Sequence, residues 1–105
     1  MEILEKFKAL IEEHFMEEHD IAFYENKMKI KPKYLSKVSK KFNQPPPCQL
    51  LLQKQIDHSR HLLIHTEKTV KEIAYEMNFQ DPYYFSRVFK KKTGVSPTQY
   101  REIHK

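Results

Sequence analysis

An eight-residue segment of this chain occurs twice, fifty residues apart. Residues 34–41 read YLSKVSKK, and residues 84–91 read YFSRVFKK. In both copies the apolar positions recur at helical spacing and leave a cationic stripe on the opposite face. A proline, Pro32 or Pro82, precedes each copy, and the first turn of a helix tolerates proline because its N–H groups have no intrahelical partner. The repeat therefore predicts two similar helices, at 32–42 and 82–93.

The composition favours an all-α fold. The 105 residues include one glycine and no tryptophan, whereas a β-sandwich or barrel needs many tight turns. The length suits one domain with a single core. We predict about seven helices in two lobes, residues 1–47 and 67–105, each containing a helix, a tight turn and one copy of the repeated helix. A long connecting helix at 48–66 joins the lobes.

Caps and breakers place the other helices of the first lobe. Apolar residues at 3.6-residue spacing predict a first helix from residue 3 to about residue 18. A short helix at 21–28 follows it. Prolines 45–47 then interrupt the chain, because proline removes a backbone donor and forces the preceding residue toward extended conformations. The connecting helix is expected to begin after them, near residue 50.

In the second lobe, the sequence gives clearer signals for where helices begin and end. Thr69 and Glu72 form the T-x-x-E pattern of a capping box, which starts a helix at Val70. Asn78 is expected to end that helix in a left-handed conformation. Gly94 closes the second repeated helix in the same way, and a last short helix follows it.

The charge is unevenly distributed. Residues 1–25 contain eight acidic residues and two lysines, whereas residues 26–56 contain eight lysines and no acid. The whole chain carries a net charge of +5. Such a bias favours a polyanionic partner, because each neutralised phosphate releases counterions. The plainer interpretation is a solvated, lysine-rich face.

The repeated helices present donors and acceptors that suit the edges of base pairs. Arginine and lysine match guanine O6 and N7, and hydroxyl groups match several base edges. The outward stripes are Lys33, Ser36, Lys37 and Lys40 in the first copy and Tyr83, Ser86, Arg87 and Lys90 in the second. Phosphates, which position a protein without revealing sequence, are the expected partners of Lys31, Lys40, Lys41, Gln80, Lys90, Lys91 and Lys92.

Residues 73–101, IAYEMNFQDPYYFSRVFKKKTGVSPTQYR, resemble the signature of AraC/XylS-type transcription regulators, and the resemblance extends over residues 21–101. It implies two homeodomain-like lobes that form the C-terminal, DNA-binding domain of a bacterial cytoplasmic regulator. The helices at 32–42 and 82–93 would enter successive major grooves of double-stranded DNA. By position, the base-reading residues would be Lys33, Ser36, Lys37, Tyr83, Ser86 and Arg87. The other expected partner is RNA polymerase, and an effector-sensing or dimerisation domain is expected in a longer parent chain.

The first lobe departs from the family pattern more than the second. Glu25 stands where a small residue is usual, and Lys29 and Gln44 stand where glycines are usual. Ser39 replaces the aromatic residue that Phe89 supplies in the second copy. We therefore expect the first lobe to be the looser one.

Other functions find less support. No Gly-rich phosphate loop or nucleophile elbow occurs, so we predict no catalytic residue and no cofactor. His58, His61 and His65 share one side of the connecting helix, but no cysteine or carboxylate cluster completes a metal site, and we predict none. The lone Cys48 points to a reducing compartment, and no apolar run is long enough to span a membrane.

The alternative function is a helical protein–protein interaction module without sequence-specific DNA readout. In that case the acidic first helix would dock a partner and the basic face would be incidental. Salt dependence distinguishes the two, because affinity for phosphates falls steeply as salt rises.

Overall fold

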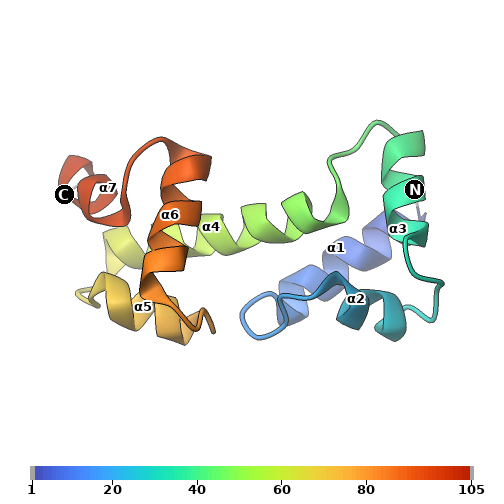
Figure 1. Cartoon of the computed structure of the whole chain (residues 1–105), viewed down its shortest axis with the longest axis horizontal. Helices are drawn as coiled ribbons and strands as arrows, with labels where there is room; N and C mark the ends of the chain where they lie inside the picture. Colours follow the sequence, from blue (N-terminus) through green and yellow to red (C-terminus); the bar gives the residue numbers. More distant parts are fainter. Residues whose placement is uncertain (1, 105) are drawn as a thin grey trace. The chain divides into compact units, whose positions relative to one another are not determined.

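The computed structural model describes residues 2–104, which form seven α-helices and no strand (Figure 1). The prediction of an all-α fold of about seven helices is confirmed. The helices are α1 (Glu2–His14), α2 (Ile21–Lys27), α3 (Tyr34–Lys41), α4 (Pro47–His65), α5 (Val70–Glu76), α6 (Pro82–Thr93) and α7 (Pro97–Ile103).

The chain divides into two compact units, one ending at Lys54 and the other beginning at Gln55. The helix α4 supplies the last residues of the first unit and the first residues of the second. The finer division into lobes 1–47 and 67–105 around a separate connecting segment at 48–66 stays a prediction. Within residues 2–104, no helix has the length and apolar character needed to cross a membrane.

In the first unit, α1 packs against α2 and α3 (Figure 1). Phe7 of α1 and Tyr24 of α2 are fully buried and meet edge to face, with ring centroids 5.6 Å apart. The Tyr24 hydroxyl donates to the Glu18 carbonyl at 2.8 Å. Burial, and secondarily the Glu18 carboxylate, raise the pKa of Tyr24 to about 12. Other apolar residues buried in this unit are Leu4, Ile11, Phe15, Leu35 and Leu51.

The first helix is shorter than predicted, because α1 ends at His14. The chain then leaves the helical conformation so that Asp20 can adopt extended backbone dihedrals and accept a hydrogen bond from the Ala22 N–H at 3.0 Å. This N-cap begins α2. The N-terminal part of α4 contacts α1 through an ion pair, in which Lys54 Nζ lies 2.8 Å from Glu12 Oε1.

In the second unit, α6 packs against α5 and α7. Its core is a row of aromatic rings, in which Phe79 and Phe85 have centroids 5.1 Å apart, Phe85 and Phe89 6.0 Å, and Phe89 and Tyr100 5.5 Å. Ile73 and Ala74 of α5 and Met77, which follows α5, are also fully buried in this unit.

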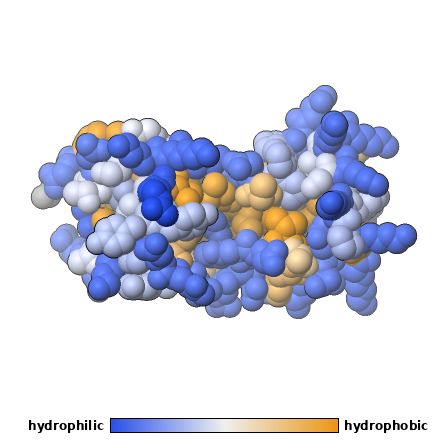
Figure 2. Space-filling view, viewed as in Figure 1, coloured by the Kyte–Doolittle hydropathy of each residue, from blue (hydrophilic) through white to orange (hydrophobic). Residues whose placement is uncertain are grey.

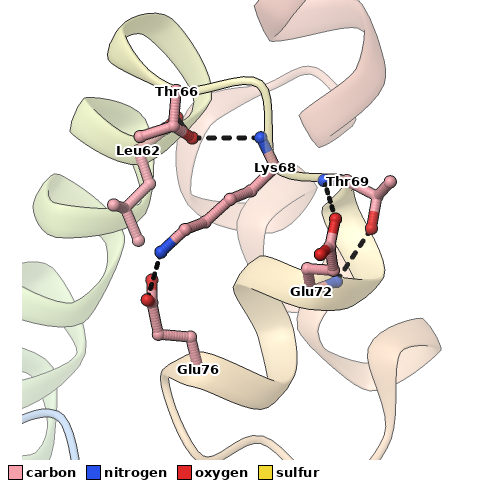
Figure 3. Close-up of polar contacts among 6 residues, drawn as sticks. All are labelled: Leu62, Thr66, Lys68, Thr69, Glu72 and Glu76. Carbon is pink, nitrogen blue, oxygen red and sulfur yellow. Dashed lines mark hydrogen bonds and ion pairs between the residues drawn. The ribbon is translucent and has the colours of Figure 1, made fainter.

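Polar contacts fix the ends of the second unit's helices (Figure 3). The Thr69 N–H donates to Glu72 Oε1 at 2.8 Å, and the Glu72 N–H donates to Thr69 Oγ1 at 3.0 Å, which is the predicted capping box. The hydrogen bond from the Thr69 backbone N–H, and secondarily one from the Thr69 side chain, lower the pKa of the Glu72 carboxyl group. Lys68, which precedes α5, pairs with Glu76, the last residue of that helix (Figure 3).

Candidate nucleic-acid interface

The helix α6 begins and ends at the residues that its sequence predicted. Asp81 Oδ1 accepts a hydrogen bond from the Tyr83 N–H at 2.9 Å, and Pro82 occupies the first turn. Gly94 terminates the helix with φ of 90°. Phe85 and Phe89 are fully buried on its inner face. The opposite face of α6 is therefore held outward on a rigid apolar base.

The predicted base-reading residues of α6 lie on that outward face. The Tyr83 side chain is 79% exposed, which is unusual for a tyrosine on a packed helix. Arg87 is exposed, and Ser86 is half-buried. Among the predicted phosphate contacts, the exposed side chains are Gln80, Lys90 and Lys91, and Lys92 is half-buried.

A groove with a volume of about 540 Å³ lies beside α6. It runs between α5 and α6, and Gln80, Tyr83 and Ser86 line it. From α5 it is lined by Lys71 and Tyr75, which the sequence reasoning missed. Their spacing of i and i+4, opposite the buried face of α5, is the signal that would have found them.

The first repeated helix begins later than predicted, so the range 32–42 is wrong at its start. The helix α3 starts at Tyr34, Pro32 precedes it, and Lys33 has the left-handed φ of 70°. The connection explains the difference. Five residues separate left-handed Asn78 from Tyr84, but only four separate left-handed Lys29 from Tyr34. The first unit therefore has no counterpart of the capping residue Asp81.

A carboxylate from α2 takes over the missing cap. Glu25 Oε2 accepts a hydrogen bond from the Lys33 N–H at 2.7 Å, and the Glu25 side chain is buried, at 8% exposure. An N-terminal helix end leaves N–H groups unbonded and favours a negative charge. The glutamate at a position where the family usually has a small residue thus has a structural role here.

The remaining candidates of the first unit lie on its surface. Lys33 is exposed but belongs to the turn before α3, whereas Ser36, Lys37 and Lys40 form an exposed stripe on α3 itself. Lys31 and Lys41 are exposed at the two ends. The space-filling view shows hydrophilic side chains over most of the visible face (Figure 2).

The inner face of α3 carries a smaller buried side chain than that of α6. Ser39 occupies the position of Phe89 and is 1% exposed, and its Oγ has no hydrogen-bond partner among the residues that the structure describes. A groove of about 310 Å³ lies beside α3 on the side of α1. Lys37 and Lys41 line it together with Glu2, so part of the cationic stripe faces an acidic residue of α1.

The histidine row of α4 brings two rings close together. The His61 and His65 centroids lie 4.5 Å apart, and those of His58 and His61 lie 6.2 Å apart. Within residues 2–104, no group of three or more histidine, cysteine, aspartate or glutamate side chains is placed to hold a metal ion. Cys48 is exposed.

Comparison with known proteins assigns the fold to a family. A family model described as a helix-turn-helix domain matches residues 24–103. This chain belongs to the AraC-type helix-turn-helix family. It is thus a sequence-specific DNA-binding domain of the kind found in transcription regulators, and the family is not one of enzymes.

Individual relatives agree with this assignment. The transcriptional activator RhaR of Klebsiella pneumoniae is 44% identical over 52 residues, which are 50% of this chain and 18% of RhaR. The C-terminal domain of the two-component response regulator yesN from Fusobacterium nucleatum is 32% identical, with a TM-score of 0.85 over 96% of this chain and 99% of that domain. The DNA-binding domain of AdpA, solved with a target DNA, shares the fold at 22% identity, with a TM-score of 0.82 over 96% of this chain and 91% of AdpA's.

Proposed function

We propose that this domain reads duplex DNA through α3 and α6, which enter successive major grooves. The observation that supports this most is the outward face of α6, which carries Tyr83, Ser86 and Arg87. On the inner face of the same helix, Phe85 and Phe89 are fully buried. A rigid helix of this kind fits the major groove, and its side chains carry the donors and acceptors needed there. In the first unit we assign base contacts to Ser36 and Lys37, with Lys33 approaching from the preceding turn.

Phosphate contacts are proposed for the lysines that flank these stripes. Phosphate neutralisation supplies affinity that is independent of sequence, whereas base contacts supply specificity. The proposed phosphate set is Lys31, Lys40, Lys41, Gln80, Lys90 and Lys91, with Lys92 beside it. This division gives each group of side chains a different signature in a binding experiment.

The setting of the domain is also a proposal. The matched stretch makes up 18% of the length of RhaR, a transcriptional activator, and yesN is a two-component response regulator. We propose that this domain works in the bacterial cytoplasm as the C-terminal part of a regulator, beside a domain that senses an effector or dimerises. Contact with RNA polymerase would link its binding to transcription.

Selection from a random duplex pool at two salt concentrations tests the DNA proposal. We expect a bipartite motif with blocks about one helical turn, ~10 bp, apart. A single block would mean that the first unit holds only the backbone. Absence of any enriched sequence would contradict the proposal, and salt-independent capture of a protein partner would instead favour the interaction module.

Two variants distinguish base contacts from phosphate contacts. Arg87→Ala should cost about 1–3 kcal/mol on the selected site and relax one base position. Lys91→Ala should weaken binding to all sequences alike and reduce the salt slope by about 0.9. Equal losses on all sequences for Arg87→Ala would contradict its assignment as a base-reading residue.

A further inference from the structure

Tyr84 lies between the buried core of the second unit and its proposed reading surface. Its side chain is 51% exposed although it belongs to a well-packed helix. On one side its ring meets that of buried Phe79, with centroids 6.4 Å apart. On the other side, Arg87 Cζ lies 5.9 Å from the Tyr84 ring centroid. One aromatic ring therefore connects the core to the guanidinium group of α6.

This contact changes what the guanidinium group can do. A free arginine side chain samples many rotamers, and fixing them costs conformational entropy when a base is bound. An aromatic ring three residues earlier on a helix is close enough to restrict those rotamers. The ring also attracts the cation, and the guanidinium plane can stack on it while its N–H groups remain free.

We infer that Tyr84 is a positioning residue, which holds the Arg87 guanidinium group outward so that its two N–H donors are ready to contact a guanine edge. The inference rests on the proposed function, in which Arg87 reads a base. A bidentate contact to guanine O6 and N7 depends on the direction of the guanidinium plane. Tyr84 would therefore contribute to specificity without itself touching the base.

The first unit offers an internal comparison. Tyr34 and Lys37 have the same spacing as Tyr84 and Arg87, and Tyr34 is also exposed, at 43%. Among residues 2–104, however, no cation lies over the Tyr34 ring. The cation–ring contacts of the first unit are Lys41 with Phe42 and Lys54 with Phe15, so the repeated tyrosine has a cation over its ring only at Tyr84. A lysine is a point charge without a planar fork, so orientation matters less to it. Tyr34→Leu is consequently the matched control for Tyr84→Leu.

The experiment measures base preference in six proteins. Selection from the random pool is run on the wild type, on the single variants Arg87→Ala, Tyr84→Leu, Tyr84→Phe and Tyr34→Leu, and on the double variant Arg87→Ala/Tyr84→Leu. Affinities are then compared for the selected site, for versions of it in which a guanine is replaced, and for non-specific duplex. If the wild type selects no motif, the proposed function fails. If it selects a motif and Arg87→Ala relaxes one guanine, the positioning role of Tyr84 can be judged separately.

We expect Tyr84→Leu to reduce the preference for that guanine by about two- to five-fold, the range of an exposed cation–π contact. Affinity for non-specific duplex and preferences at other positions should be unchanged. Tyr84→Phe should retain the preference, because the ring supplies the contact. Tyr34→Leu should leave that guanine unaffected. In the Arg87→Ala background, Tyr84→Leu should have no further effect on this position.

Three results would overturn the inference while leaving the proposed function intact. The first is full retention of the preference in Tyr84→Leu, and the second is an equal loss of affinity for all sequences in that variant. The third is a Tyr84→Phe variant that behaves like Tyr84→Leu, which would assign the effect to the hydroxyl group. A DNA-free measurement provides a separate check. The NMR signals of the Arg87 side chain should carry ring-current shifts that disappear in Tyr84→Leu, while the circular dichroism spectrum of the variant stays native.

Discussion

The two units present the same kind of surface, an outward cationic helix, but they hold that helix differently. In the second unit the ends of α6 are set by neighbours in sequence, Asp81 and Gly94. In the first unit the start of α3 depends on Glu25, eight residues before the group that it caps. The comparison shows that the two units keep a similar outward row of side chains although their helices begin differently. Residues next to the helix cap α6, whereas a buried side chain from another helix caps α3.

The backbone shows the same difference. The non-glycine residues with positive φ are Lys29, Lys33, Asn43 and Asn78, so the first unit contains three of the four. A left-handed conformation costs a side chain-bearing residue roughly 1–2 kcal/mol, and asparagine tolerates it best. Two of the first unit's three are lysines. We therefore expect the first unit to unfold more readily, and the following changes test that expectation.

The largest effect should come from removing the aromatic core of the second unit. Phe89→Ala should lower the free energy of unfolding by about 3–5 kcal/mol, because a fully buried ring leaves a cavity. The matched change Ser39→Ala should be neutral or stabilising, since it removes a buried hydroxyl that has no partner among the described residues. Urea unfolding followed by circular dichroism measures both. Comparable losses at the two positions would show that the units are packed alike.

Removing the long-range cap should have the next largest effect. Glu25→Ala should cost about 1.5–3 kcal/mol, the range for a hydrogen bond to a charged group, and it should fray the start of α3. Glu25→Gln keeps an oxygen acceptor and should lose less. Amide hydrogen exchange at Lys33 and Tyr34, combined with urea unfolding, measures the effect. Unchanged protection in Glu25→Ala would show that α3 does not need this cap.

Relieving backbone strain should stabilise the first unit. Lys29→Gly should raise the free energy of unfolding by about 1 kcal/mol, because glycine has no Cβ to strain at a φ of 57°. The equivalent change Asn78→Gly should gain less, since asparagine already tolerates the conformation. Thermal unfolding of the two variants compares them directly. A larger gain for Asn78→Gly would reverse the proposed order of strain.

The smallest effect should be the pH dependence of the capping box in the second unit. The pKa of Glu72 is lowered in the folded state by the Thr69 hydrogen bonds, so its contribution to stability is present above the ordinary glutamate pKa. That contribution is lost as the pH falls through the lowered, folded-state value. Glu72→Gln should remove this part of the pH dependence. In an NMR titration, Thr69→Ala should move the Glu72 pKa only part of the way back, because it removes the side-chain hydrogen bond and keeps the backbone N–H, which contributes most. A full return to the ordinary glutamate pKa would contradict this order of causes.

The sequence predicted the second unit more accurately because its signals are local. Asp81, Pro82 and Gly94 each act on the nearest turn, and the bounds of α6 followed from them. The start of α3 was predicted wrongly because Pro32 occupies the same place in the repeat as Pro82 but does not begin a helix. The N–H group at the start of α3, that of Lys33, is bonded by Glu25 of another helix. No periodicity reveals such a bond before the fold is known.

In the candidate site, too, the features set by local sequence were predicted and those set by tertiary packing were missed. The outward stripes followed from helical spacing, and their residues are exposed apart from the half-buried Ser86. The contribution of Lys71 and Tyr75 to the groove, and the contact between Tyr84 and Arg87, were missed. Both depend on how α5 and the neighbouring rings pack beside α6, which is a property of tertiary structure. Their roles in DNA binding stay predictions.

The end of α4 has a consequence for synthesis of the chain. Arg101 Nε donates to the Leu63 carbonyl at 2.9 Å, and its Nη2 donates to the Thr66 carbonyl at 3.3 Å. These acceptors precede their donor by 38 and 35 residues. On the ribosome, the last turn of α4 therefore emerges well before the side chain that satisfies it. The second unit can close this end of α4 only when α7 has been made, so folding of this unit is completed at the end of translation of these residues.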